Sequence, residues 1–408
     1  MGKKGTAGNQ GPEIRSDCYA AFELKSSGGR EIILASKVDA LYKQSIQNLA
    51  HQILDFFNIK DAKLEIIDRG ALTFVLAARI ESAVKECLET GEEFLLDMIP
   101  ENQYQTEKDR SRRSRLYLPG NTPRLMLNAG IHQPDGIILD LEDSVAPEKK
   151  AQARLVVRNA LRQVNFYGAE RMVRINQIPM GLEDLTFIVP HHVNLILLPK
   201  CESADQVQAV DQKITEVLSD SGMDYPVYIM PIIESALGVI KSFEIASSSE
   251  RVAALAIGLE DYTADLGAPR TTEGRETFYA RSQVVNAARA AGIQAIDSVF
   301  SDVADMDALR EVVLESKSLG FDGMGCIHPR QIKIIHEAFK PTEAEIAKAE
   351  KIVRAFDEAT LKGLGVVSLG SKMIDPPVVK RAQKMINLAV KSGQLSEDWK
   401  EQETDPDK

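Results

Sequence analysis

The sequence contains little cysteine and none of the spacings that would pair it. The four cysteines lie far apart and form neither a CxxC pair nor a metal-ligand spacing, at Cys18, Cys87, Cys201 and Cys326. Such usage is typical of a reducing compartment and argues against a disulfide-rich secreted domain. No apolar run approaches the roughly 20 residues that span a bilayer, and the basic start of the chain lacks the apolar core of a secretory signal. We therefore expect a cytoplasmic protein without a membrane partner.

Positive charge is also in deficit. The chain has 49 Lys and Arg against 60 Asp and Glu, a formal net charge of −11. This balance works against nonspecific binding to nucleic acid, so we expect no nucleic-acid partner. A GxGxxG motif after the first strand of the main domain and a GxSxG elbow are both missing, which argues against the usual dinucleotide-binding and serine hydrolase folds.

A short polar segment divides the chain. Residues 101–111 (ENQYQTEKDRS) contain almost no apolar side chain and are predicted to form a flexible linker. The predicted organisation is a loose tail (1–16), a small domain (17–100), the linker (101–111), a main domain (112–340), a C-terminal segment (341–396) and a second tail (397–408).

The small domain is predicted to be α+β, with two hairpins that are each followed by a helix. The first hairpin turns at Gly28 and Gly29, which tolerate the positive φ of a tight turn, and Ser26 and Ser27 lie at its exposed tip. The expected elements are strands at Cys18–Leu24, Glu31–Ala35, Lys63–Ile67 and Ala71–Leu76, and helices at Asp39–Phe57 and Ala78–Leu88.

In the main domain, eight short apolar runs alternate with helical stretches. Continuous apolar strands between helices indicate a parallel sheet that is covered on its outer faces. Eight such units in this length favour an α/β fold of the (β/α)8 barrel type, with a C-terminal helical lid, and an open doubly wound sheet is the alternative. The runs are Arg115–Leu118, Gly136–Leu141, Met172–Ile175, Leu195–Leu198, Val227–Ile233, Ala253–Leu259, Ala295–Val299 and Gly323–Ile327.

Charged or polar residues follow nearly every run. Because the carboxyl ends of barrel strands converge on one mouth, we expect these side chains to share a site. A single charge there can simply mark a strand end that enters solvent, but six strand ends together favour a site. The residues in question include Asp140, Glu142, Asp143, Arg174, Lys200, Glu234, Asp261 and His328.

Glu234 and Asp261 form the sharpest pair, because they follow neighbouring strands. Two close carboxylates repel each other unless one is protonated or a cation lies between them. Mg²⁺ commonly takes one or two protein carboxylates and leaves its other positions to water and substrate. We therefore predict a Mg²⁺ site at this pair; a pair of solvated or arginine-paired acids is the alternative.

Arg174 and Lys200 each allow two interpretations. Arg174 can clamp a substrate carboxylate through two parallel hydrogen bonds, or it can pair with Asp140 or Glu142. Lys200 can act as a Schiff-base nucleophile, although the metal-type carboxylates favour a metal mechanism.

Asp375 lies in the C-terminal segment, after the glycine-rich stretch 363–368 and before Pro376 and Pro377. An acid on a hinged segment outside a barrel can act as a lid group. The alternative is an ordinary aspartate at the start of a helix.

From Arg112 to Asp375 the chain resembles the citrate lyase β subunit family of the HpcH/HpaI aldolase superfamily. The segments that carry the resemblance are RRSRLYLPGNTP, GIILDLEDSVAPEKKAQAR, VRIN, LILLPK, IESALGV, LEDYTADLG, FYARSQVVNAARAAGI and GLGVVSLGSKMIDPPVV. The small domain resembles the citrate lyase γ subunit, an acyl carrier, in ELKSS and KLEIIDRGALTFVLAARIESAV. It departs from the carrier pattern at Lys25, where the family has an acid.

The resemblance implies roles for individual residues. Glu234 and Asp261 would hold Mg²⁺, and Arg174 would bind a substrate carboxylate, with Arg113 and Lys200 as further substrate contacts. Glu142 and Asp143 would order the water molecules on the metal. Asp375 would return a proton from a segment that closes over a neighbouring subunit. Ser26, or alternatively Ser27, would carry a phosphoribosyl-dephospho-CoA arm.

The implied activity is that of a lyase. It would cleave a citryl thioester on the carrier into oxaloacetate and an acetyl thioester, within a homotrimeric core that needs a citrate lyase α transferase as partner. A flexible linker would keep the carrier at a local concentration on the order of millimolar. The alternatives are a citramalyl- or malyl-type lyase acting on acyl-CoA or acyl carrier, and a non-catalytic scaffold that only docks carriers.

Overall fold

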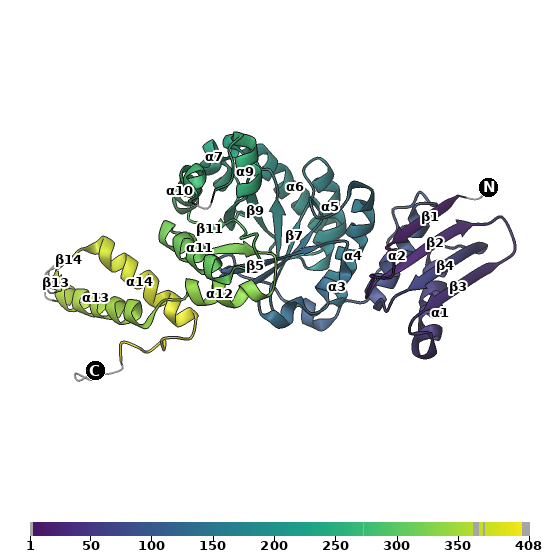
Figure 1. The fold of residues 1–408 in the computed structure, drawn as a ribbon, viewed down its shortest axis with the longest axis horizontal. Helices are drawn as coiled ribbons and strands as arrows, with labels where there is room; N and C mark the ends of the chain where they lie inside the picture. Colours follow the sequence, from purple (N-terminus) through teal and green to yellow (C-terminus); the bar gives the residue numbers. More distant parts are fainter. Residues whose placement is uncertain (1–2, 272, 362–366, 370–371, 402–408) are drawn as a thin grey trace. The chain divides into compact units, whose positions relative to one another are not determined.

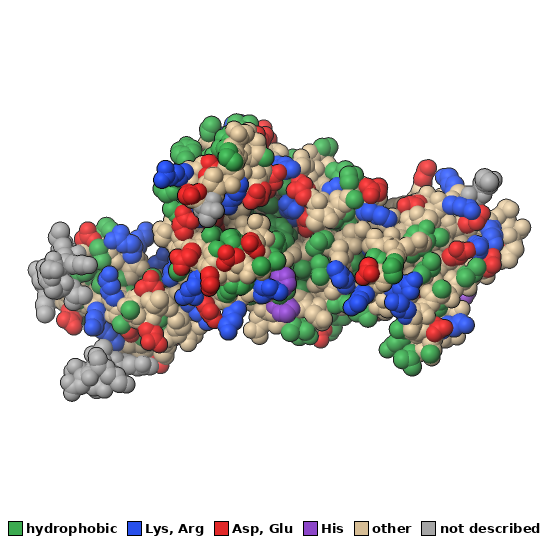
Figure 2. Space-filling model, viewed as in Figure 1, with side chains coloured by type: hydrophobic (Ala, Val, Ile, Leu, Met, Phe, Trp, Pro, Cys, Tyr) green, Lys and Arg blue, Asp and Glu red, His purple; other side chains and the backbone are tan. Residues whose placement is uncertain are grey.

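The computed structural model describes residues 3–271, 273–361, 367–369 and 372–401. The chain forms two compact units, Met1–Ile332 and Lys333–Lys408. The first unit contains a small sheet domain and a barrel. None of the described helices is long and apolar enough to cross a bilayer. On the face shown in Figure 2, basic and acidic side chains are interspersed, so neither sign of charge dominates there.

Eight parallel strands close into a barrel, which confirms the predicted fold and excludes the open sheet. Their order around the barrel follows the chain, with β12 pairing back to β5. Each strand lies within about two residues of its predicted run, and β8 coincides with it. The strands are β5 (Ser114–Pro119), β6 (Gly136–Asp140), β7 (Glu170–Arg174), β8 (Leu195–Leu198), β9 (Tyr228–Ile233), β10 (Ala254–Ile257), β11 (Gln294–Asp297) and β12 (Gly323–Cys326).

Helices cover the outside of the barrel, as Figure 1 shows for α4, α5 and α6. Both faces of each strand are therefore buried, which is why Leu195–Leu198 can be apolar throughout. Residues that point inward fill the barrel with an apolar layer that includes Ile138, Met172 and Met230. The helices of the barrel are α3 (Pro123–Met126), α4 (Lys150–Gln163), α5 (Met180–Ile188), α6 (Ala204–Asp220), α7 (Ala236–Ile240), α8 (Ser242–Ala246), α9 (Leu259–Leu266), α10 (Arg275–Ala290), α11 (Met306–Leu319) and the start of α12 (Arg330–Phe339).

The small domain has a four-stranded sheet in the order β1-β2-β4-β3. Strand β4 pairs antiparallel with β2 and parallel with β3. The predicted hairpin between β2 and β3 is therefore wrong: helix α1 carries the chain back so that β4 inserts between them. The elements are β1 (Lys4–Gly8), β2 (Cys18–Leu24), β3 (Arg30–Ser36), α1 (Asp39–Phe56), β4 (Ala62–Asp68) and α2 (Thr73–Lys85).

Two further expectations for this domain are corrected. The tail 1–16 is not loose throughout, because Lys4–Gly8 form strand β1 along β2. The predicted strand Ala71–Leu76 is mostly the start of α2, whose residues 74–84 are all buried. Its β-branched and aromatic residues favour a strand locally, but packing against the sheet decides the outcome.

Buried polar contacts hold the small domain against helix α4 of the barrel. Glu81 and Arg158, both fully buried, form an ion pair of 2.5 Å. The Asn159 amide donates to the carbonyl of Phe74 at 3.0 Å. The amide of Gly8 donates to Gln152 at 3.0 Å. Since buried charges are tolerated only when they are paired, this interface fixes the two domains to each other.

The segment predicted as a flexible linker is instead packed on the barrel. Asn102 is fully buried and donates to the carbonyls of Leu161 and Val164 at 2.8 and 2.7 Å. Thr106 donates to Glu170 at 3.0 Å at the start of β7. Polar side chains here satisfy buried backbone groups, so a low apolar content did not mean mobility.

The second unit contains α13 (Glu343–Leu361), the two-stranded β13 (Val367–Leu369) and β14 (Lys372–Ile374), and α14 (Pro376–Lys391). Ile352, Ile386 and Trp399 share one apolar core. The tail predicted from residue 397 therefore includes a buried tryptophan. The glycines at 363 and 365 that suggested a hinge, and residues 402–408, lie outside the described part of the chain.

We predict that Arg158→Met lowers the free energy of unfolding by about 3–5 kcal/mol. The variant removes the guanidinium that donates to both oxygens of the buried Glu81 carboxylate and leaves that charge with Lys85 alone. Arg251→Met is the control: its partner Asp211 is partly exposed, so the loss should be at most about 1 kcal/mol. Urea unfolding of the full chain measures both. Equal losses in the two variants would contradict the buried interface.

Candidate functional site

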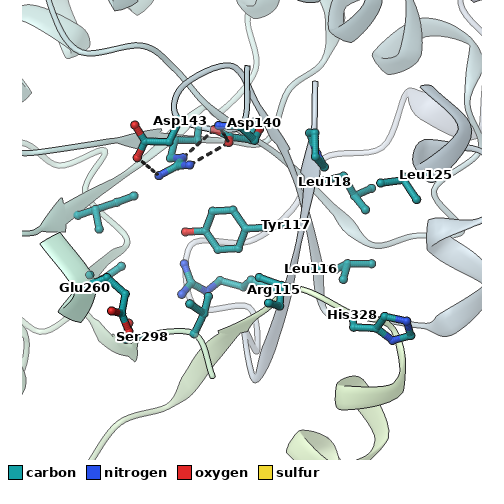
Figure 3. A pocket seen from close by; sticks show the side chains of 18 of the residues that line it. Arg115, Leu116, Tyr117, Leu118, Leu125, Asp140, Asp143, Glu260, Ser298 and His328 are labelled. Atoms are coloured by element: carbon teal, nitrogen blue, oxygen red, sulfur yellow. Dashed lines mark hydrogen bonds and ion pairs between the residues drawn. The ribbon is translucent and has the colours of Figure 1, made fainter. Parts of the chain in front are cut away.

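A cavity of about 1190 Å³ opens at the carboxyl ends of the barrel strands. Its walls come from β5, β6, β7, β9, β10 and β11 and from the loops that follow these strands and β12 (Figure 3). This is the mouth at which active sites of such barrels are built. Its charged lining residues are Arg115, Arg124, Asp140, Asp143, Arg174, Glu234, Glu260, Asp261, Asp297 and Arg330.

Strand alternation explains why the polar groups gather here. Residues two apart on a strand point to the same side. Ile138, Met172 and Ile232 belong to the apolar layer inside the barrel. Two residues beyond each of them come Asp140, Arg174 and Glu234, so these side chains stand directly above that layer. The alternation of side chains along the three strands therefore places these polar groups at the mouth of the barrel.

Arg174 is held by carboxylates on several sides. Its Nε and Nη2 donate to the two oxygens of Asp140 at 2.7 and 2.8 Å, and its Nη1 lies 2.9 Å from Glu142 and 3.6 Å from Asp143. Burial alone would lower the pKa of Arg174, but its bonds to Asp140 raise it above the ordinary value. The ion-pair alternative is thus present in the structure, and the substrate clamp stays a prediction.

Lys200 lies among the same acids. Its Nζ is 3.6 Å from Glu142, 3.9 Å from Asp143 and 3.8 Å from Asp261. Burial lowers the pKa of Lys200, yet these carboxylates outweigh it and the net shift is upward. A Schiff-base nucleophile needs a lowered pKa, so this environment disfavours that role.

Glu234 is the most buried acid of the predicted metal pair, with 6% of its surface exposed. Its Oε2 accepts a hydrogen bond from the Lys200 amide at 2.8 Å. Burial raises the pKa of Glu234 to about 7, and the nearby Asp261 and Glu142 add to the rise. A side chain at Gly258 would put its Cβ 2.5 Å from Oε1 of Glu234, so only glycine leaves room for this carboxyl group.

The donor set fits a divalent cation. Asp140, Glu142, Asp143, Glu234 and Asp261 outnumber the two cations Arg174 and Lys200, which leaves an excess of three negative charges when all are ionised. Over the described residues, no cluster of three or more His, Cys, Asp or Glu side chains forms a complete ligand set. Mg²⁺ does not need one, because it keeps several water ligands beside one or two carboxylates.

Arg113 is not part of this site, contrary to expectation. Strand β5 begins at Ser114, so Arg113 lies at the opposite, amino end of the barrel. There it donates to both oxygens of Asp135 at 2.9 Å. Arg115, two residues further along the chain, lines the cavity instead. Arg115, Tyr117 and Ser298 were not among the predicted site residues. The inward alternation of side chains along β5 was the available signal for Arg115 and Tyr117.

The remaining predicted residues lie elsewhere. Ser26 and Ser27 are exposed in the loop between β2 and β3. This loop is braced at its base, because the amide of Gly29 donates to Asp61 at 2.7 Å. Asp375 belongs to the second unit and caps α14 by accepting a hydrogen bond from the Val378 amide at 3.1 Å. The capping alternative is therefore present, and a catalytic role for Asp375 stays a prediction.

Comparison with known proteins identifies the barrel. The model of the family "HpcH/HpaI aldolase/citrate lyase" matches residues 113–329. The chain belongs to this family. The predicted enzyme class, a lyase, is confirmed with it. A second family model, "Malonate decarboxylase delta subunit (MdcD)", an acyl carrier, matches residues 7–87 and supports the carrier-like character of the small domain.

Individual proteins of known name are similar to this chain over about two thirds of its length. The citrate lyase subunit beta of Leuconostoc mesenteroides subsp. cremoris is 39% identical over 69% of this chain and 94% of its own length. The human mitochondrial citramalyl-CoA lyase is 33% identical over 68% and 85%. A crystal structure of CitE from Mycobacterium tuberculosis with magnesium, acetoacetate and coenzyme A is 28% identical, with a TM-score of 0.56 over 68% of this chain and 98% of that one.

We predict that Mg²⁺ binding weakens as the pH falls below about 7. The raised pKa of Glu234 means that a proton competes with the cation for this carboxylate, so affinity should drop by up to about tenfold per pH unit. Calorimetric titration with MgCl₂ at several pH values measures this. Glu234→Gln should abolish binding, whereas the exposed Glu244→Gln should leave it unchanged; a pH-independent affinity would contradict the assignment.

Proposed function

We propose that this chain is a Mg²⁺-dependent carbon–carbon lyase that cleaves a citryl thioester into oxaloacetate and an acetyl thioester. The observation that carries the proposal is the convergence of Glu234, Asp261 and Arg174 on one cavity at the mouth of the barrel. Membership of the HpcH/HpaI aldolase/citrate lyase family supports the reaction class. The magnesium in the related CitE structure supports the choice of metal.

Glu234 and Asp261 would hold the metal. When bound, Mg²⁺ would stabilise negative charge on the oxygens of the substrate's hydroxyl and carboxylate groups. Lys200 fixes Glu142, Asp143 and Asp261 relative to one another through its three ion pairs. In our proposal Glu142 and Asp143 orient the water molecules at the site, since ordered outer contacts set the geometry of a metal centre.

Arg174 would bind the substrate's carboxylate while Asp140 fixes its plane. Asp140 takes Nε and one N–H of Nη2, and Nη1 faces Glu142 and Asp143, so the second N–H of Nη2 is left for a ligand. In the reaction the substrate's hydroxyl would lose its proton to a water molecule at the site, and the adjacent carbon–carbon bond would break. The bonding electrons pass to the carbon beside the thioester, which gives an enolate. Asp375 of a neighbouring copy would then protonate that carbon, as a lid acid.

The small domain would act as the acyl carrier, with a phosphoribosyl-dephospho-CoA arm on Ser26 or Ser27. The fit is one of access: both hydroxyls are exposed, and the following Gly28 and Gly29 have open space around them. Because the domain is fixed to α4 by buried contacts, the reach of the arm must come from the arm itself rather than from a mobile linker. A citrate lyase α subunit would load the arm, and we propose a homotrimeric core.

A citramalyl-type substrate is the second candidate. The observation in its favour is the 33% identity to human mitochondrial citramalyl-CoA lyase over two thirds of this chain. That substrate would give pyruvate in place of oxaloacetate, and free CoA could replace the carrier arm.

We predict that Asp261→Asn lowers kcat for citryl thioester cleavage by at least about 100-fold, since charge stabilisation at a metal site contributes several kcal/mol. Thermal unfolding should be unchanged because the side chain is 44% exposed. Glu244→Gln serves as the control with full activity. Wild-type turnover in Asp261→Asn, or turnover in the presence of excess EDTA, would refute the metal-dependent reaction.

For the carrier, we predict a mass increment on the peptide that contains Ser26 in protein isolated from its native host. Ser26→Ala should remove the increment and Ser27→Ala should keep it; the reverse pattern assigns Ser27. Unmodified wild-type protein that turns over free CoA thioesters would exclude the carrier role.

A further inference from the structure

Arg115 is a fully buried cation without a carboxylate partner. It is 1% exposed, points into the barrel from β5 and lines the cavity. Its Nη1 lies 3.1 Å from the sulfur of Met230, and its Nη2 lies 3.5 Å from the carbonyl of Asp297. Its Nε has no hydrogen-bond partner. Across the described parts of the chain, no acid forms an ion pair with it.

The nearby charges are already committed elsewhere. Asp297 offers Arg115 only its backbone carbonyl, since its carboxylate is paired with Arg281 at 2.6 Å. Glu170 accepts two hydrogen bonds from Arg112, at 2.7 and 2.8 Å. Burial consequently lowers the pKa of Arg115. A buried guanidinium of this kind is costly unless a ligand supplies the missing anion.

Arg115 differs in this respect from Arg174, which Asp140, Glu142 and Asp143 surround. Figure 3 shows Arg115 beside the Tyr117 ring, with Asp140 and Asp143 on the other side of that ring. The cavity therefore has a carboxylate-rich end for a cation and, below it, a cationic group for an anion. A guanidinium matches a carboxylate through two parallel hydrogen bonds.

The position of Arg115 indicates which part of a substrate it would meet. Its guanidinium touches Met230 of β9 and lies beside the Tyr117 ring, in the same cavity as Glu234 and Arg174. An anion bound there would be a second one, separate from the carboxylate that Arg174 would hold. The arm of a citryl group ends in a carboxylate, whereas a citramalyl group has a methyl and a malyl group a hydrogen.

We propose that Arg115 is a specificity-determining residue that binds the second carboxylate of the oxo-acid half of the substrate and so selects citryl over citramalyl and malyl thioesters. This inference rests on the proposed lyase function, which it deepens. The site would accept oxaloacetate as a ligand and would bind pyruvate much more weakly.

The test compares the binding of fresh oxaloacetate and pyruvate, each with MgCl₂, by thermal shift and calorimetry. Wild type should bind oxaloacetate more tightly than pyruvate. Arg115→Met should weaken the binding of oxaloacetate by at least about 30-fold and change the binding of pyruvate little. Arg251→Met, on the surface, should keep the wild-type preference. Arg115→Met should also raise the melting temperature of the ligand-free protein, since it removes an unpaired buried charge.

Equal binding of the two oxo acids by wild type would overturn the proposal. So would a parallel loss for both in Arg115→Met together with a lower melting temperature, which is the signature of a structural arginine. Failure of the lyase function gives a different result. If the wild type prefers oxaloacetate but cleaves no thioester, the carboxylate site stands and the proposed reaction is wrong. If the wild type cleaves citryl thioester and Arg115→Met keeps the preference for oxaloacetate, the reaction stands and the role of Arg115 is wrong.

Discussion

Repulsion between carboxylates is the constraint on which the site depends. The ends of β6, β9 and β10 place Asp140, Glu234 and Asp261 around one cavity, and the β6 loop adds Glu142 and Asp143. Arg174 and Lys200 compensate only part of this charge. Burial raises the pKa of Glu234, and the nearby Asp261 and Glu142 add to the rise. A bound cation would relieve the repulsion, and the same cation would supply the electrophile that the proposed cleavage needs.

The barrel could be predicted from sequence because its signal is local. Strands such as Leu195–Leu198 are apolar throughout, and a charged group follows them. It was harder to predict which residues of a strand face inward, because a shift of one position changes the face of a side chain and a shift of two changes its depth in the barrel. Arg113 and Arg115 illustrate this: the first lies at the wrong end of β5, while the second is inside the cavity.

Contacts between residues far apart in sequence could not be predicted in this way. The turn residues Gly28 and Gly29 suggested a hairpin, but β4, more than thirty residues later, occupies the position between β2 and β3. The polar segment 101–111 suggested a linker, but Asn102 and Thr106 satisfy buried groups of the barrel. Turn chemistry and polarity report on the local chain, whereas these outcomes depend on partners elsewhere. The fixed small domain follows from the same kind of partner, the buried pair Glu81–Arg158.

The location of a bound metal ion tests whether Glu234 and Asp261 form the site. Crystals soaked with MnCl₂ and measured near the manganese absorption edge reveal the ion by its anomalous scattering. We predict one peak in the barrel cavity, at about 2.0–2.3 Å from an oxygen of Glu234 and an oxygen of Asp261. A cavity without a peak, or a peak bound by other residues while these two carboxylates remain apart from it, would rule out this metal site.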